Sequence, residues 1–132
     1  MADKLNKYKA IKGIVIFKRK ILLVKSRGIV GSDYESPGGR KLDKKVDDKT
    51  FLKKKIFTEV RIDVEVGKEI LKNFIYTLPE LGIELNITVY LCTAKSDKVI
   101  PEEDVIDFKW VPIEELSKSN CSEWIKKAVL NI

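Results

Sequence analysis

The feature that most constrains the fold of this sequence is one amphipathic helix placed among β-rich segments. Residues 50–60 are predicted to form this helix. Its apolar side chains recur every four residues and form one buried stripe of Leu52, Ile56 and Val60. Asp47 or Asp48 can begin the helix, because a short carboxylate accepts hydrogen bonds from the free N–H groups of the first turn. A helix with one apolar stripe has to bury it against another layer of structure.

Apolar and β-branched runs on both sides of the helix supply that layer. Residues 9–17 and 21–27 are predicted to form a hairpin joined by a polar turn. Further strands are expected at 61–66, 69–79, 84–95 and 105–113. The Pro-Gly-Gly sequence at 37–39 is predicted to interrupt regular structure. The pattern is therefore mixed β-structure with few helices.

A second helix is expected at the end of the chain. Its inner face is formed by Trp124, Ile125, Ala128 and Val129. The 132 residues contain no internal repeat, low-complexity segment or linker, and this length suits one compact domain. We expect a single α+β domain spanning residues 1–132.

Composition limits the chemistry that the chain can perform. It has no histidine, which excludes imidazole catalysis and histidine-bearing metal sites. Cys92 and Cys121 are too few for a disulfide scaffold or a zinc site, and Cys92 is expected in a buried strand. A net charge of +6 favours anionic partners such as nucleotides, RNA or phosphorylated metabolites. The N-terminus lacks a signal segment and no run approaches the ~20 apolar residues of a membrane span, so we expect a cytoplasmic protein without a membrane partner.

Four segments follow one another in a recognisable order. They are the opening hairpin, YESPGG at 34–39, the helix followed by IDVEV at 62–66, and PEEDVIDFKWVPIEEL at 101–116. In this order they resemble the Nudix hydrolase superfamily, in its MutT-like form. The resemblance covers nearly the whole chain. It implies a mixed β-sheet core sandwiched between helices. It also implies a pyrophosphohydrolase that acts on a nucleoside diphosphate linked to another moiety, with Mg²⁺ or Mn²⁺ as cofactor.

The family's metal-binding helix motif, Arg-Glu-apolar-x-Glu-Glu-x-Gly, is degenerate here. With one additional residue in the loop after Gly39, the family's arginine falls on Lys54 and its closing glycine on Arg61. The three glutamates then fall on Lys55, Thr58 and Glu59. Without that residue they fall on Lys54, Phe57 and Thr58. The first register is preferred because it keeps Ile56 and Val60 in the core, and Glu59 is then the one surviving ligand.

These substitutions remove the negative charge on which metal binding depends. In a working member the carboxylates share one helix face and hold Mg²⁺, which clamps a diphosphate and activates water. Here the formal charge over the three positions changes from −3 to 0, since Lys55 carries +1, Thr58 none and Glu59 −1. Glu59 can be a residual metal ligand and base, aided by acids of the 102–104 loop such as Glu103. It can instead pair with Lys55 or make contacts that the sequence does not reveal.

Basic, aromatic and glycine residues around this motif are candidate ligand contacts. The basic candidates are Arg40, Lys41, Lys44, Lys45, Lys53, Lys54 and Lys55. The aromatic candidates, which could stack on a base or an RNA end, are Tyr34, Phe74 and Tyr76. Lysine binds phosphate directly at many anion sites, so these groups need no metal. Gly38 and Gly39 would shape a tight turn beside the cleft. The alternative is that the lysines are solvated and the aromatic rings belong to the core.

Three functions remain open from the sequence. The first is a protein that binds a nucleotide or another phosphate ligand with weak or no hydrolysis. The second is an active but atypical pyrophosphohydrolase, with Glu59 and acids of the 102–104 loop holding metal. The third is a non-catalytic, RNA-associated or structural module. Many Nudix relatives pair, so a homodimer is possible in each case.

Overall fold

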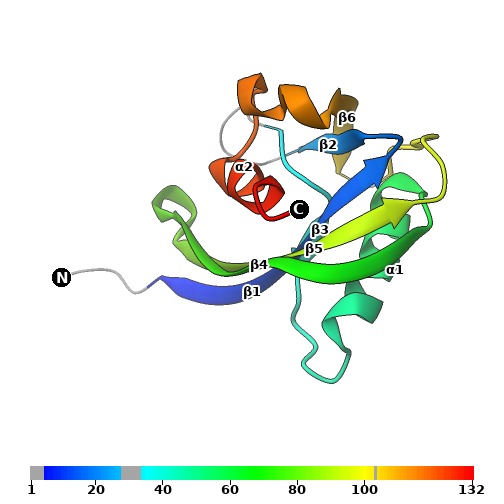
Figure 1. Cartoon of the computed structure of the whole chain (residues 1–132). Helices are drawn as coiled ribbons and strands as arrows, with labels where there is room; N and C mark the ends of the chain where they lie inside the picture. The colour runs from blue at the N-terminus through cyan, green and yellow to red at the C-terminus, as the bar shows by residue number, and fades with distance from the viewer. Residues whose placement is uncertain (1–4, 28–33, 103) are drawn as a thin grey trace.

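The computed structural model describes residues 5–27, 34–102 and 104–132. The strands are β1 (Asn6–Phe17), β2 (Lys20–Ser26), β3 (Gly38–Arg40), β4 (Val64–Leu78), β5 (Ile83–Ala94) and β6 (Val105–Pro112). The helices are α1 (Asp48–Val60) and α2 (Glu123–Val129), with 3₁₀ turns η1 (Pro79–Leu81) and η2 (Ile113–Lys118). α1 and α2 pack on opposite faces of the sheet (Figure 1), so the expected α+β sandwich is confirmed.

The sheet has the order β4-β5-β1-β2-β6, with β3 beside β1. β1 and β5 are parallel, and the other neighbours are antiparallel. The β1–β2 hairpin is confirmed, and it pairs Ile16 with Ile21 and Phe17 with Lys20 next to the turn. Farther from the turn, β3 takes the place beside β1, where Lys12 lies opposite Gly38. The two strands of the hairpin therefore separate, and the main chain of β3 enters the gap.

Helix α1 forms where the four-residue spacing predicted it. Asp47 is the N-cap, and its side chain accepts a hydrogen bond from the Thr50 N–H at 3.1 Å. The predicted stripe is fully buried, at Leu52, Ile56 and Val60. It packs on one face of the sheet with residues such as Ile11 and Val15 of β1. Burial of this stripe fixes which face of α1 can turn towards a ligand.

The opposite face of the sheet is covered by α2. Trp124, Ile125 and Ala128 are buried as predicted, and Val129 is partly buried against the same cluster. The cluster includes Ile14 of β1, which alternates with the residues that face α1. The predicted burial of Cys92 is also confirmed, and burial raises the pKa of its thiol to about 12.

Two details differ from the sequence prediction. Residues 61–66 and 69–79 are not two strands, because β4 runs continuously from Val64 to Leu78. Three register shifts against β5 allow it to continue past Gly67, and Asn73 adopts a φ of 56° within this region. Pro37 lies in a bend, as the predicted interruption requires, but Gly38 and Gly39 belong to β3 and do not form the expected tight turn.

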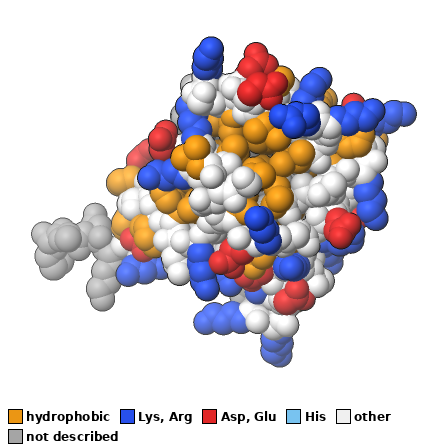
Figure 2. Space-filling model, viewed as in Figure 1, with side chains coloured by type: hydrophobic (Ala, Val, Ile, Leu, Met, Phe, Trp, Pro, Cys, Tyr) orange, Lys and Arg blue, Asp and Glu red, His pale blue; other side chains and the backbone are white. Residues whose placement is uncertain are grey.

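The surface in the same orientation shows apolar side chains gathered near the middle and Lys and Arg side chains around the edge (Figure 2). Among the described residues, no helix is both long enough and apolar enough to span a bilayer.

Candidate functional site

A cavity of about 290 Å³ opens where β1 and β2 separate. Its lining comes from β1, β3, β5, α1, the end of β2 and the segment before β6. The charged residues that line it are Lys12, Arg27, Arg40, Lys55, Glu59 and Asp104. The described lining therefore carries four cations and two anions.

Glu59 is held at this cavity by the main chain of β3. Its Oε1 accepts a hydrogen bond from the Gly38 N–H at 2.9 Å. Gly38 has a φ of 139°, and a Cβ there would lie 2.2 Å from the Ile11 carbonyl oxygen. Only glycine tolerates such a φ without strain, so this close approach depends on Gly38. The contact between Glu59 and Gly38 was not foreseen from the sequence.

The end of α1 agrees with the preferred register of the degenerate motif. Arg61, which stands in place of the family's closing glycine, adopts a left-handed φ of 59°. Its N–H donates to the Phe57 carbonyl at 2.9 Å, as a left-handed C-cap does. Ile56 and Val60 are both fully buried, as that register requires.

The acidic loop lies directly against the end of α1. The N–H of Ile100 donates to the Val60 carbonyl at 3.0 Å, and the N–H of Glu102 donates to the Glu59 carbonyl at 2.9 Å. The Glu102 carboxylate accepts from Nε of Arg61 at 3.4 Å, whereas Asp104 lines the cavity. Glu103, the candidate metal ligand of this loop, lies outside the described residues.

The described donor set does not fit a diphosphate-clamping Mg²⁺ ion, because such an ion needs several carboxylate oxygens in one place. Thr58 uses its hydroxyl to donate to the Lys54 carbonyl at 2.9 Å. Lys55 places its aliphatic stem beside Gly39, where an added Cβ would meet Cε at 2.9 Å. Within the described ranges, no group of three His, Cys, Asp or Glu residues is arranged to hold a metal ion. Among the described residues, the carboxylates that line the cavity are Glu59 and Asp104, together with four cations.

The structure brings some of the predicted ligand contacts together and separates others. Gly38, Gly39, Arg40 and Lys55 all line the cavity with Glu59. Lys54 is exposed and is not part of that lining.

Tyr34 does not line the cavity and is engaged elsewhere. Its hydroxyl donates to Asp107 at 2.5 Å, and Nζ of Lys109 lies 4.3 Å from its ring centroid. The hydrogen bond to Asp107, together with burial and the negative charge of that carboxylate, raises the pKa of Tyr34. The ring therefore lies over the paired strands β2 and β6, against Lys25 and Lys109, and is not part of the cavity that Glu59 lines.

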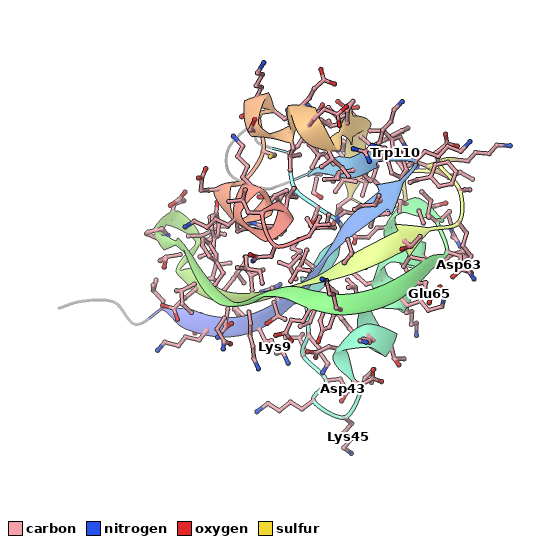
Figure 3. All side chains as sticks on the ribbon, in the orientation of Figure 1. Lys9, Asp43, Lys45, Asp63, Glu65 and Trp110 are labelled. Carbon is pink, nitrogen blue, oxygen red and sulfur yellow. The ribbon has the colours of Figure 1, made fainter. Side chains whose placement is uncertain are left out.

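The remaining basic candidates lie around the rim of the molecule. Lys53 forms an ion pair with Asp63 at 2.7 Å, just before β4 begins. Figure 3 labels Asp63. Lys45 projects from the loop that precedes α1 (Figure 3). Lys41 is buried against Asp48, at 2.9 Å. These side chains do not line the cavity that contains Glu59.

Sequence analysis missed two cations of the site, Lys12 and Arg27. Lys12 interrupts the apolar second half of β1, between the buried Ile11 and Ile14, and that interruption was an available signal. Arg27 follows β2 in a polar segment and had no distinguishing pattern. Only the tertiary structure places it opposite β3.

A second, mostly apolar cavity of about 230 Å³ adjoins the first. Lys12, Arg40 and Leu85 line both, so the two compartments are contiguous. The other residues that line it include Tyr76, Leu78, Leu81, Ile83, Ile87 and Trp124. Of the predicted stacking rings, Tyr76 is in this lining. Phe74 is not, and it packs instead against the α2-side core.

Comparisons with known proteins support the fold. The chain matches no protein-family model and no curated protein sequence. It is similar to a solved MutT Nudix hydrolase from Burkholderia pseudomallei, with a TM-score of 0.80, 18% identity, and coverage of 96% of this chain and 98% of that one. It is also similar to a MutT protein from Methanosarcina mazei Go1, with a TM-score of 0.80, 15% identity, and coverage of 98% and 94%.

A third similar structure is a C. elegans Ap4A hydrolase in a binary complex. The TM-score is 0.73 at 14% identity, and the alignment covers 94% of this chain and 93% of that one. The three structures agree over almost the whole length of the chain. Together with the strand order and the position of α1, they show that this protein has the Nudix hydrolase fold.

Proposed function

We propose that the protein binds a nucleotide or another phosphate-bearing small molecule at the cavity beside Glu59, with weak or no hydrolysis. The observation that carries this proposal is the charge of the cavity. In the described lining there are four cations, Lys12, Arg27, Arg40 and Lys55, against two carboxylates. Lysine and arginine bind phosphate oxygens through charge-assisted hydrogen bonds, so the ligand needs no divalent ion as an intermediary.

The same residues explain the expected loss of turnover. The family reaction needs a cation held by carboxylates, which activates water and neutralises the diphosphate. Lys55 and Thr58 replace two of the three helix carboxylates, and the third, Glu59, accepts the Gly38 N–H. The basic side chains of the described lining can therefore hold and orient a phosphate through their N–H groups, while the Glu59 carboxylate is occupied by the Gly38 N–H.

The competing proposal is an active enzyme in which Glu59, Asp104 and Glu103 hold Mg²⁺ or Mn²⁺. Nucleoside triphosphates, ADP-ribose and dinucleotides, incubated with either ion, distinguish the two when phosphate-containing products are measured. We expect no turnover above the rate of a Glu59→Gln variant. Robust turnover that Glu59→Gln abolishes would establish the enzyme and overturn our proposal.

Binding is tested separately by calorimetry with inorganic diphosphate in EDTA. Lys12→Ala or Lys55→Ala should weaken binding by about ten-fold, the equivalent of losing one charge-assisted hydrogen bond. Lys54→Ala is the matched control, since Lys54 is exposed and outside the cavity lining. Equal loss in all three variants would show non-specific attraction to a basic surface.

The same preparation tests the remaining alternatives. Tight, strongly salt-dependent binding to an RNA oligomer, without binding of diphosphate, would favour the RNA-associated module. Sedimentation would report whether the protein forms the homodimer that we consider possible. We place the protein in the cytoplasm.

A further inference from the structure

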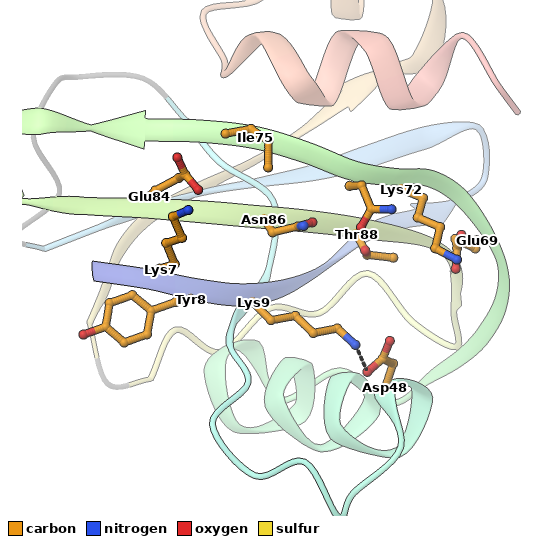
Figure 4. A pocket seen from close by; sticks show the side chains of 11 residues that line it. Lys7, Tyr8, Lys9, Asp48, Glu69, Lys72, Ile75, Glu84, Asn86 and Thr88 are labelled. Carbon is orange, nitrogen blue, oxygen red and sulfur yellow. Dashed lines mark hydrogen bonds and ion pairs between the residues drawn. The ribbon is translucent and has the colours of Figure 1, made fainter. Parts of the chain in front are cut away.

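The two sides of strand β5 differ sharply in character. Ile83, Leu85 and Ile87 alternate along the strand and line the apolar cavity. Glu84, Asn86 and Thr88 occupy the positions between them and line a polar groove of about 560 Å³ on the other face. Figure 4 shows this polar groove, with Lys9 paired to Asp48 at its edge. Because side chains alternate strictly along a strand, the apolar lining is set by the register of β5.

β4 continues the apolar side of this arrangement. Tyr76 and Leu78 line the apolar cavity, whereas Ile75 lines the polar groove on the opposite face. Leu81 of η1 also lines the cavity and is 48% exposed, whereas Trp124 of α2 lines it and is buried. The lining therefore extends from an exposed leucine to a buried indole.

The apolar cavity is continuous with the cationic one. Lys12 and Arg40 line both cavities, and so does Leu85. A phosphate held by these cations would direct its organic substituent along Leu85 into the apolar compartment. The volumes of about 290 Å³ and 230 Å³ together fall within the range of ~300–1,000 Å³ that is usual for small-molecule sites.

We infer that the ligand is a phosphate or diphosphate ester of an apolar alcohol, whose hydrocarbon chain occupies this compartment. The inference rests on the proposed function and narrows its ligand class. A nucleobase presents several ring N–H and carbonyl groups that need partners when they are buried. Among the described residues of the lining, the charged side chain other than the two shared cations is Glu35, whose Oε1 accepts the Ser122 hydroxyl at 2.5 Å. A hydrocarbon chain has no such requirement and gains affinity from burial alone.

The test is a series of alkyl phosphates of increasing chain length, from ethyl to octyl, titrated calorimetrically in EDTA below their micelle concentrations. Inorganic phosphate and AMP complete the series. We expect inorganic phosphate to bind and each added methylene to lower Kd about three- to four-fold until the compartment is full. AMP should bind more weakly than hexyl phosphate.

A substitution in the apolar cavity tests whether the dependence of Kd on chain length arises there. Leu81→Gln should flatten the dependence on chain length and leave the Kd of inorganic phosphate unchanged, because Leu81 is absent from the cationic lining. Ile75→Gln is the matched control, since this exposed side chain on the opposite face should leave the whole series unchanged. Unchanged melting temperatures would show that both variants fold.

The possible failures can be told apart. Binding of inorganic phosphate with no dependence on chain length, or AMP binding more tightly than hexyl phosphate, would overturn this inference and leave the proposed function in place. A chain-length dependence that survives Leu81→Gln and Leu78→Gln would also overturn it. Absence of binding by any phosphate compound would overturn the proposed function and the inference with it.

Discussion

The two sides of helix α1 differ in how closely they match what the fold and the family motif require. The inner side, Leu52, Ile56 and Val60, is fully buried and has the spacing that the fold requires. The side that faces the cavity presents Lys55 and Glu59, and it carries one carboxylate where the family motif has three. In helix α1 the positions that form the core are thus different from the positions that hold metal in the family motif. The fold is retained at 18% identity to a solved MutT Nudix hydrolase, because the buried positions alone are enough to specify it.

The largest expected effect comes from the inner side. Ile56→Ala should lower the free energy of unfolding by about 2–5 kcal/mol, because it removes buried methylenes and leaves a cavity. The measurement is urea unfolding followed by circular dichroism. Lys54→Ala on the exposed side is the control and should change stability by less than ~0.5 kcal/mol. Comparable losses from both variants would contradict the division between the two sides.

The next effect comes from rebuilding the motif on the cavity side. Lys55→Glu combined with Thr58→Glu restores three carboxylates, including Glu59, on one helix turn. The variant should bind Mn²⁺, and a ten-fold excess of Mn²⁺ over Kd should stabilise it by about 1.4 kcal/mol, seen as a raised melting temperature.

The matched control for this variant is Lys54→Glu combined with Thr58→Glu. It makes the same change in net charge but places one carboxylate on the exposed side of α1. Equal Mn²⁺ stabilisation of both variants would mean that total charge, and not geometry at the cavity, governs metal binding. It would also contradict the register assigned to the motif.

The smallest effect concerns Asp48, at the start of α1. Its Oδ1 accepts from Lys41 at 2.9 Å and from Lys9 at 3.0 Å, and its Oδ2 accepts from the Tyr90 hydroxyl at 3.2 Å. Burial favours the protonated form, but the two lysines outweigh it and lower the pKa of Asp48 below its ordinary 3.8. Asp48→Asn should therefore cost about 1 kcal/mol at neutral pH.

The pH dependence of that cost follows from the direction of the shift. A carboxylate with a lowered pKa in the folded state stabilises the protein above its unfolded pKa and loses this contribution as the pH falls through the folded value. The difference between wild type and Asp48→Asn should stay constant from pH 8 to pH 5, begin to shrink near the ordinary pKa of 3.8, and disappear only below the lowered pKa of the folded protein. A difference that grows towards low pH would refute this assignment.

Most of the fold could be predicted from the sequence because it depends on local periodicity. The spacing of Leu52, Ile56 and Val60 sets the face of α1, and β-branched runs mark the hairpin. The division of β4 was wrong because Gly67 and the charged residues after it resemble a break, whereas pairing with β5 carries the strand through its register shifts. Local patterns do not contain the energy of that pairing.

The site was less predictable because it is assembled from distant segments. Comparison with the family motif identified Glu59, Arg40 and Lys55, all of which line the cavity. It did not identify Arg27, whose position depends on the separation of β1 from β2, nor the hydrogen bond between Gly38 and Glu59. No periodicity in the sequence relates residues 21 positions apart across a turn.

Arg61 links the end of α1 to the acidic loop in a way that a glycine would not. A side chain at this left-handed position costs about 1–2 kcal/mol in backbone strain, yet the guanidinium lies 5.5 Å from the Phe57 ring centroid and engages the Glu102 carboxylate. A glycine there would relax the backbone but would remove both side-chain contacts. The residue that ends the helix therefore also fastens the acidic loop, whose Glu102 N–H donates to the Glu59 carbonyl at 2.9 Å, to the last turn of α1.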